Sequence, residues 1–370
     1  MRDKMTVLFP ILARYPTEKA YGVTTKYTAE AIQNLGFDTF ILTPKPGAHQ
    51  YSKVPTVALG KFFYQLAMND RINILINLRF SVFQIYFYLN ILVKYRFQGN
   101  IYWTRDLLIS FLLSLKKSNT VICEVHRTPS FLNMILLNKL KVKKNVLITP
   151  ITLSLGEKLG VPPERSVIAP MSINETEIEN NLRKFPYKQK NIVYVGNFVS
   201  GGYRLDLNLI NNLAININEL YPEWTFEIIG IKKNEIKKNC RKSISPNLSI
   251  YERLEREVLI DKLAVSSIGL VIYPNNKYFI DSFPIKIVEY ASAQIAIIAS
   301  DTIAHKSILN SDTCVFFSTG SETSLLSTVR LVIDDFKLRE RVSKNAFNWV
   351  KELTYENRVK NIIDKLKTLR

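Results

Sequence analysis

The chain has little cysteine, little histidine and too few acidic residues to balance its basic ones. Three cysteines and three histidines occur among 370 residues, and the cysteines show neither metal-ligand spacing nor an even pairing. This pattern excludes a disulfide framework and a cysteine-based metal site. Because no signal-peptide pattern follows Met1, we expect a protein of the reducing cytoplasm.

A long uninterrupted apolar run is also missing. The most apolar and aromatic stretch spans Ile72 to Phe97, but its uncharged part runs only from Phe80 to Val93. A transmembrane helix needs about 20 largely apolar residues. The sequence therefore predicts a buried or surface-docked helix here, and no membrane-spanning segment.

Basic residues are in large excess, with 50 Lys and Arg against 32 Asp and Glu and a net charge of +18. Such a chain favours polyanionic partners, namely nucleic acid, an anionic membrane surface or phosphorylated substrates. No recognisable nucleic-acid module surrounds the basic clusters, so no nucleic-acid partner is expected. Peripheral contact with an anionic membrane and simple solvation of lysine-rich faces are the two remaining explanations. The clusters are Lys139 to Lys144, Arg183 to Lys190 and Lys232 to Lys242.

The order of strand and helix patterns predicts an α/β fold. A hydrophobic fraction of 47% and a charged fraction of 22% are typical of globular proteins, and 370 residues suggest two domains. The chain begins with a strand at Thr6–Phe9, a helix at Val23–Leu35 closed by Gly36, and a strand at Asp38–Thr43. Parallel strands need helical crossovers, so this alternation predicts doubly wound sheets. Further strands are expected at 101–104, 120–125, 146–148, 167–169, 192–196, 225–229, 248–251, 268–273, 295–300 and 314–317.

A polar, charged stretch containing Pro186 interrupts this alternation. We therefore predict an N-terminal domain at residues 1–173, a linker at 174–190 and a C-terminal domain at 191–350. The last stretch, 351–370, is typical of a helix, which we expect to pack back toward the N-terminal domain.

The most informative segment runs from residue 278 to 291, between two predicted strands. Pro284 suits the first turn of a helix, and Lys286 and Glu289 then share one face and can pair weakly. A glutamate in this position can accept hydrogen bonds from the two hydroxyls of a ribose. Backbone N–H groups at the helix start can hold a diphosphate. The alternative is a solvated Lys–Glu pair on an ordinary helix.

This segment, Pro-x-Lys-x-x-Glu-Tyr-Ala with Asp281 before it, resembles the donor-site signature of GT-B glycosyltransferases. It is similar to glycosyltransferase family 4, in a variant of bacterial polysaccharide-assembly type. In support, 194–198 resembles the strand that opens the family's C-terminal domain, and 150–170 resembles the end of its N-terminal domain. The resemblance implies two Rossmann-like doubly wound domains facing across a cleft, the N-terminal one for the acceptor and the C-terminal one for the donor.

The activity that the resemblance implies is transfer of a sugar, with retention, from a nucleotide-sugar to a glycan, lipid-linked or other surface-polysaccharide acceptor. An acceptor of this kind would place the protein in the cytoplasm, on the inner face of the membrane. A nucleotide-sugar epimerase of the same fold and a non-catalytic polyanion-binding protein are the alternatives.

The resemblance assigns roles within the donor segment. Glu289 would bind the ribose hydroxyls, and Asp281 would lie near the hydroxyls of the transferred sugar, where the family usually has a glutamate. Ser282 and Phe283 would offer backbone N–H groups to phosphate or sugar.

The family also holds the donor diphosphate with a basic pair that this chain lacks in its usual form. Asn197 stands after Gly196 where the family has an arginine, and Arg204 stands near the position of the family's lysine. The resemblance therefore assigns the leaving diphosphate to Arg204, with Lys286 sharing its charge.

In the N-terminal domain the resemblance indicates His126, at a strand end where the family often has a histidine facing the sugar–phosphate junction. A structural histidine is the alternative. Glu124, two residues earlier, projects to the same face of the strand. Tyr21 and Arg105 are expected on the acceptor side. For Arg105 the alternative is a surface position, with Asp106 capping the next helix.

A metal-binding Asp-x-Asp motif is absent from the chain. Asp334 and Asp335 are predicted to form a turn and a helix N-cap. Transferases that hold a diphosphate through a divalent cation generally need such carboxylates. We therefore expect no metal and no cofactor, the nucleotide-sugar being a co-substrate.

Overall fold

The computed structural model describes residues 6–13, 15–17, 20–44, 53–59, 76–95, 100–184, 188–200, 203–274, 276 and 279–369. The chain divides into two compact units. Unit 1 consists of Met1–Pro170 with Tyr355–Arg370, and unit 2 consists of Met171–Thr354. The stretch predicted as a linker is part of unit 2 and contains helix α7 (Glu175–Lys184). The last helix, α15 (Tyr355–Thr368), belongs to unit 1.

Unit 1 is built on a six-stranded parallel sheet with the strand order β3-β2-β1-β4-β5-β6. The order reverses between β1 and β4, so the carboxyl ends of these two strands mark the place where α/β sheets bind ligands. The strands are β1 (Thr6–Pro10), β2 (Asp38–Thr43), β3 (Thr56–Ala58), β4 (Ile101–Thr104), β5 (Thr120–Val125) and β6 (Val146–Pro150).

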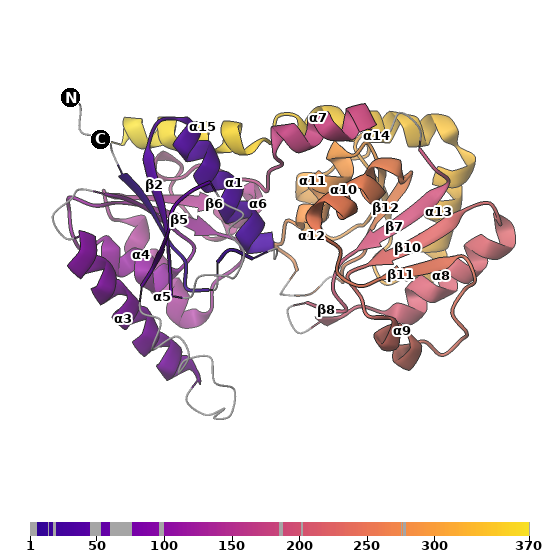
Figure 1. Ribbon diagram of the computed structural model, residues 1–370, viewed down its shortest axis with the longest axis horizontal. Coiled ribbons are helices and arrows are strands. Elements are labelled where there is room, and N and C mark those ends of the chain that lie inside the picture. The colour runs from indigo at the N-terminus through magenta and orange to yellow at the C-terminus, as the bar shows by residue number, and fades with distance from the viewer. Residues whose placement is uncertain are drawn as a thin grey trace. The chain divides into compact units, whose positions relative to one another are not determined.

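Helices cover both faces of this sheet (Figure 1). Helix α1 (Ala20–Asn34) and α15 lie on one face, where Phe9, Trp103, Ile32 and Val359 share a buried core. Helices α3 (Ile76–Tyr95), α4 (Leu107–Leu113) and α5 (Phe131–Lys141) lie on the other face. Helix α6 (Leu153–Lys158) and the short helix η2 (Pro163–Arg165) follow β6.

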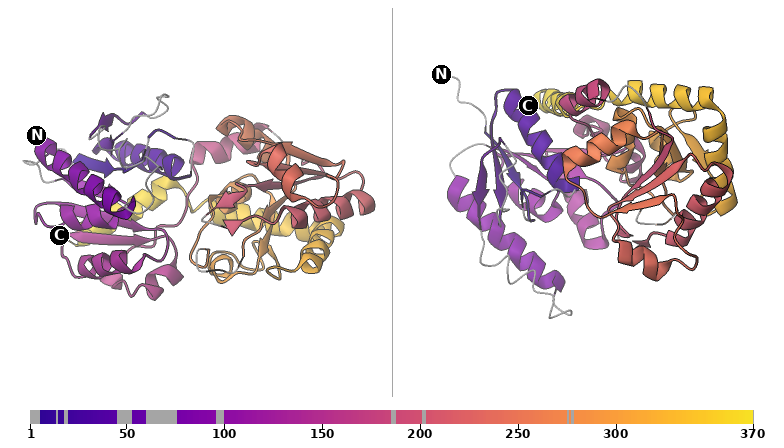
Figure 2. Two further views of the ribbon diagram at one scale, coloured as in Figure 1. Left: turned by 90° about the horizontal axis from the view of Figure 1, so that it is seen from below. Right: turned by 45° about the vertical axis from the view of Figure 1, so that its right-hand side comes forward.

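Unit 2, which Figure 2 shows in two further views, repeats the architecture of a sheet with helices. Its strand order is β11-β10-β7-β12-β13-β14, and its switch point lies between β7 and β12. Its strands are β7 (Asn191–Val195), β10 (Thr225–Ile229), β11 (Leu248–Tyr251), β12 (Ile268–Val271), β13 (Ala296–Ser300) and β14 (Val315–Phe317), with the hairpin β8 (Val199–Ser200) and β9 (Tyr203–Arg204) outside the sheet. Besides α7, its helices are α8 (Leu207–Leu220), α9 (Lys233–Asn239), α10 (Arg256–Val265), α11 (Ile285–Ser292), α12 (Ile303–Ile308), α13 (Glu322–Asp334) and α14 (Phe336–Val350).

Two doubly wound sheets confirm the predicted fold class, but some boundaries were wrong. Helix α1 begins at Ala20 rather than Val23, although it ends as predicted before Gly36, whose φ of 88° suits a residue without a Cβ. The predicted strand at 167–169 is extended chain that hydrogen-bonds along β6 without joining the sheet as a strand. Asp335 caps α14 by accepting from the N–H of Leu338, as predicted.

Candidate functional site

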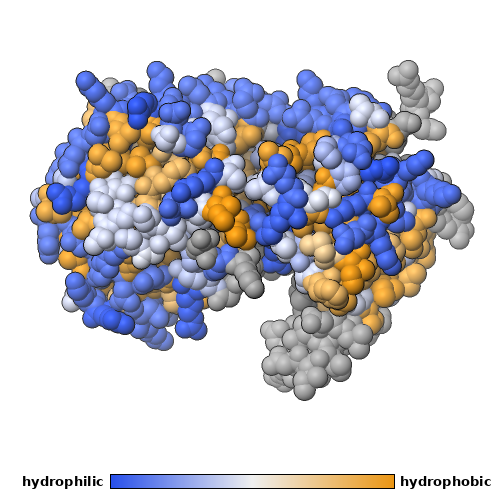
Figure 3. All heavy atoms as spheres, turned by 180° about the vertical axis from the view of Figure 1, so that it is seen from behind, coloured by the Kyte–Doolittle hydropathy of each residue, from blue (hydrophilic) through white to orange (hydrophobic). Residues whose placement is uncertain are grey.

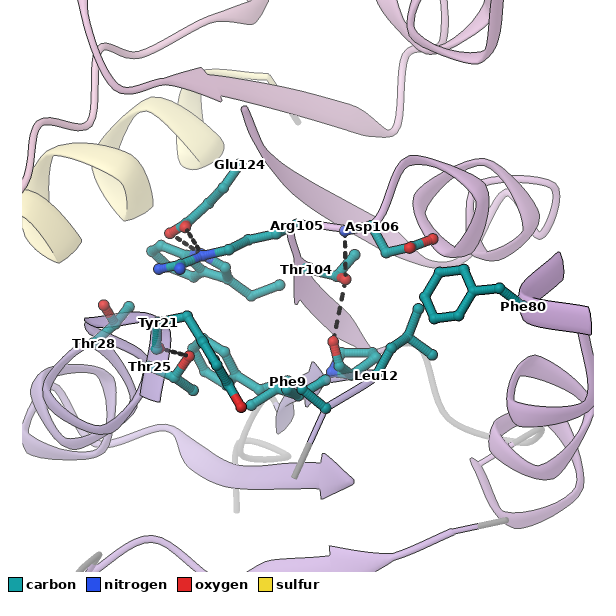
Figure 4. Close-up of a pocket in the computed structure, with 14 residues that line it drawn as sticks. Phe9, Leu12, Tyr21, Thr25, Thr28, Phe80, Thr104, Arg105, Asp106 and Glu124 are labelled. Atoms are coloured by element: carbon teal, nitrogen blue, oxygen red, sulfur yellow. Dashed lines mark hydrogen bonds and ion pairs between the residues drawn. The ribbon is translucent and has the colours of Figure 1, made fainter. Parts of the chain in front are cut away.

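A cavity of about 330 Å³ opens at the carboxyl ends of β1 and β4 in unit 1. Figure 4 shows Phe9, Leu12 and Tyr21 around its apolar part and Arg105 with Glu124 at one side. Both residues predicted on the acceptor side, Tyr21 and Arg105, therefore line one cavity at the switch point of the sheet. The remaining lining residues are Pro10, Ile11, Ala13, Thr25, Thr28, Phe80, Trp103, Thr104 and Asp106.

Glu124 is the centre of a buried charge network beside this cavity. Its carboxylate accepts from Trp103 Nε1 at 2.7 Å, Arg105 Nε at 2.8 Å and Arg358 Nη2 at 2.5 Å, and contacts His126 Nε2 at 2.8 Å. Burial by itself would raise the pKa of Glu124, but the Arg358 and Arg105 guanidinium groups hold that pKa well below its usual range. Glu124 is therefore an ionised anchor for its neighbours and unsuited to act as a base at neutral pH.

Arg358 reaches this network from α15, near the end of the chain. Its side chain is 2% exposed, and Nη1 donates to Thr28 Oγ1 at 3.1 Å. The sequence interpretation missed this residue. A signal was present, because Arg358 lies within the buried helical stripe formed by Tyr355, Val359 and Ile362, where an unpaired charge would be costly.

The contact with Glu124 determines the tautomer of His126. An ionised carboxylate only accepts, so Nε2 carries the proton and Nδ1 carries a lone pair. Burial and the nearby Arg105 lower the pKa of His126 to about 4, against the opposing effect of Glu124. His126 is therefore neutral at pH 7, and its Nδ1 can accept a hydrogen bond from a ligand hydroxyl.

Asp106 and Arg105 are neighbours in the sequence but form different interactions. Asp106 caps α4 by accepting from the N–H of Ile109 at 2.8 Å, and it also accepts from Gln84 Nε2 at 2.6 Å. The capping alternative is thus confirmed for Asp106, while Arg105 pairs with Glu124 instead of lying free at the surface.

In unit 2, Glu289 lies on α11 and is only 6% exposed. Arg256 at the start of α10 donates to Glu289 through Nη1, and to both oxygens of Glu177 on α7 through Nε and Nη2 at 3.2 and 2.8 Å. The two carboxylates raise the pKa of Arg256 although its burial acts in the opposite direction. Arg256 thus fixes the Glu289 carboxylate, a contact between helices that local spacing in the sequence did not reveal.

Lys286 does not pair with Glu289, so the predicted weak pair was wrong. Its side chain is buried, and Nζ has no hydrogen-bond partner among the described residues. Nζ lies 4.2 Å from the centre of the Tyr194 ring and 5.1 Å from that of Tyr273. A Cβ at Gly196 would lie 3.0 Å from Nζ and 2.8 Å from the Tyr194 hydroxyl, so the lack of a side chain at Gly196 gives the ammonium room beside the end of β7. Burial lowers the pKa of Lys286 to about 7.

The other predicted donor-site residues are more scattered. Asp281 is 5% exposed in the turn before α11. The Ser282 N–H, predicted to face phosphate or sugar, donates to the Phe279 carbonyl at 3.0 Å in this structure. Phe283 is buried, with its ring 6.5 Å from that of Trp349.

Asn197 and Arg204 are both exposed, one before β8 and the other in β9. In the parts of the chain that are described, no group of His, Cys, Asp and Glu side chains could hold a metal ion.

Comparison with known proteins identifies the chemistry of unit 2. Residues 175–349 match the family model of glycosyl transferases group 1, a range that contains Glu289, Lys286 and Arg256. Residues 175–349 are those of a group 1 glycosyltransferase, and the chain as a whole has the GT-B fold. No curated protein matches the sequence. The glycosyltransferase signature at 281–291 was thus read correctly from the sequence.

Solved structures support the fold over the whole chain. A glycosyltransferase from Rickettsia africae has a TM-score of 0.72 at 14% identity, covering 99% of each chain. WaaG, a glycosyltransferase involved in lipopolysaccharide biosynthesis, has a TM-score of 0.66 at 12% identity, covering 98% of this chain and 99% of its own. Anabaena HepE in complex with UDP-glucose has a TM-score of 0.65 at 10% identity, covering 98% of this chain and 100% of its own.

Proposed function

We propose that this glycosyltransferase moves a sugar from a nucleotide-sugar to a glycan or lipid-linked acceptor, with retention and without a metal ion. The observation that carries the proposal is the buried Glu289 on α11. It lies in the part of the chain that matches group 1 glycosyltransferases, on the helix whose Lys286 ammonium sits beside the end of β7. Carboxyl strand ends at a switch point are where such sheets bind nucleotides.

On the donor side, Glu289 accepts from the ribose hydroxyls, and Arg256 holds its carboxylate in place. Lys286 supplies the buried cation for the diphosphate. An arriving diphosphate favours the protonated form of a lysine whose pKa is about 7 without it. Arg204, on the exposed hairpin, adds a second cation as the leaving group gains charge. Asp281 orients the hydroxyls of the transferred sugar.

On the acceptor side, the cavity of unit 1 binds the acceptor between Tyr21 and Arg105. Its aromatic and aliphatic lining suits the apolar faces of a sugar ring or the start of a lipid chain. His126 accepts a hydrogen bond from a sugar hydroxyl through Nδ1. The basic charge of the chain suits an acceptor at the cytoplasmic face of a membrane.

Thermal unfolding against a panel of nucleotide-sugars tests the donor half of this proposal. A ligand at about 100 times its Kd adds about 2.7 kcal/mol of stability, roughly 5–10 °C in Tm. UDP-glucose is the first candidate, because HepE binds it. Lys286→Met should lose most of the shift. Lys262→Met is the matched control, since Lys262 also lies over a tyrosine, with Nζ 3.9 Å from the centre of the Tyr251 ring. No shift with any nucleotide-sugar would contradict the proposal.

A further inference from the structure

Helix α3 is apolar on both of its faces, although one face is exposed. Phe83, Phe87 and Ile91 point into unit 1 and are at most 1% exposed. Along the opposite side run Val82, Ile85, Leu89 and Val93, with exposed fractions of 48%, 46%, 50% and 80%. Their spacing of three and four residues makes one stripe along the helix. A helix that is apolar all round is normally covered on all sides.

The apolar surface continues onto α5. Phe131, Leu132 and Ile135 are 81%, 72% and 42% exposed. Helix α4 packs against both α3 and α5, so the three helices form one layer on the sheet. Figure 3 shows hydrophobic side chains reaching the surface of unit 1 between polar areas. Exposed apolar areas of this extent mark interaction sites for proteins or membranes.

The charge of the layer formed by α3, α4 and α5 distinguishes between a second copy of the chain and a lipid membrane as its partner. Helices α3, α4 and α5 contain no Asp or Glu, and between Leu107 and Lys144 the only acidic residue is the buried Glu124. Two copies of such a surface would repel each other, so a second copy of the chain is a poor occupant. Lysines lie in the last turn of α3 and α5 or within the few residues that follow α4 and α5: Lys94, Lys116, Lys117, Lys139, Lys141, Lys143 and Lys144.

We propose that the surface formed by the exposed sides of α3 and α5 docks onto an anionic lipid membrane. The apolar side chains enter the headgroup boundary, and the lysines contact anionic headgroups. The proposed contact is peripheral. In the part of the chain that the structure describes, none of the helices meets the length and hydropathy that a membrane span requires. The docking surface deepens the proposed function by bringing a lipid-linked acceptor to unit 1, but the binding itself does not depend on catalysis.

Vesicle flotation with the full chain tests the docking. Wild type should bind vesicles of neutral lipid plus phosphatidylglycerol, bind neutral vesicles at least tenfold more weakly, and dissociate at high salt. Lys139→Gln with Lys144→Gln should weaken binding about 25-fold, at roughly fivefold per lysine. Leu89→Ser with Val93→Ser, and Phe131→Ser with Leu132→Ser, should each weaken it at least tenfold. Leu220→Ser with Leu331→Ser is the matched control in unit 2, where both leucines are 49% exposed.

Several results would overturn the proposal: no binding to anionic vesicles, equal binding to neutral ones, or an equal loss in the unit 2 control. A concentration-dependent dimer that the α3 and α5 substitutions dissolve would instead assign the surface to a second copy. Thermal shift with the nucleotide-sugar should stay unchanged in all these variants. A loss of docking is thereby distinguished from a failure of donor binding.

Discussion

Glu289→Gln is expected to lower kcat/KM for the nucleotide-sugar by roughly 10- to 150-fold, because a hydrogen bond to a charged group contributes about 1.5–3 kcal/mol. Glutamine keeps the shape of the side chain, and its amide oxygen can still accept from Arg256. Arg256 also retains Glu177 on its other side. The substitution should therefore leave the fold intact, and steady-state kinetics together with thermal unfolding would separate the two effects.

Glu227→Gln is the control for this experiment. Glu227 is another partly buried glutamate of unit 2, paired with Lys262 at 2.8 Å and remote from α11 in sequence. It should change kcat/KM less than twofold. Full activity in Glu289→Gln, or an equal loss of kcat/KM in Glu227→Gln, would show that Glu289 does not bind the donor.

Arg358→Met is expected to damage both stability and catalysis, although Arg358 touches no substrate in this account. Removing one partner of a buried ion pair costs about 3–5 kcal/mol of unfolding free energy, because Glu124 loses a donor it cannot replace with water. Misplacement of Arg105 and His126 by about 1 Å would lower kcat/KM on the order of 100-fold. Urea unfolding and kinetics measure the two losses, and Arg358→Lys should recover part of both.

The pH dependence shows whether Arg358 acts through the site. Glu124 has its pKa depressed in the folded state, so its pairing stabilises the protein above its ordinary pKa and is lost as the pH falls below it. The stability difference between wild type and Arg358→Met should therefore shrink in acid. The Arg358 charge also depresses the pKa of His126, which is about 4. Without that charge, the acid limb of kcat/KM should move to higher pH.

Arg339→Met supplies the control, because Arg339 is a partly buried arginine of unit 2 that donates to the Val332 and Ile333 carbonyls and not to Glu124. It should leave the acid limb in place. If Arg358→Met does not move the acid limb of kcat/KM, Arg358 has a structural role only.

The fold was largely predictable because buried parallel strands appear in the sequence as short apolar, β-branched runs. The segment around Glu289 was found for a similar reason, since its signature lies within a few neighbouring residues. The hairpin of β8 and β9 was not found, because two-residue strands leave no periodic pattern.

Contacts between residues that are far apart in the chain could not be predicted from the sequence. Arg358 and Glu124 are separated by 234 positions, and Arg256 and Glu289 by 33. No local spacing connects such pairs. For Lys286 the local spacing predicted a contact that does not form. Its distance of three residues from Glu289 suits a pair on a helix, but its ammonium packs beside Gly196 and Tyr194 instead.

The most direct test of the central claim measures nucleoside diphosphate release by the full chain. The nucleotide-sugar that stabilises the protein would be supplied with EDTA, with and without glycan and lipid-linked acceptors, and the product examined by NMR. The account predicts that nucleoside diphosphate release depends on the acceptor, persists in EDTA and is lost in Glu289→Gln. The glycosylated product should keep the anomeric configuration of the donor sugar. Conversion of the nucleotide-sugar to an isomer without any acceptor would contradict it.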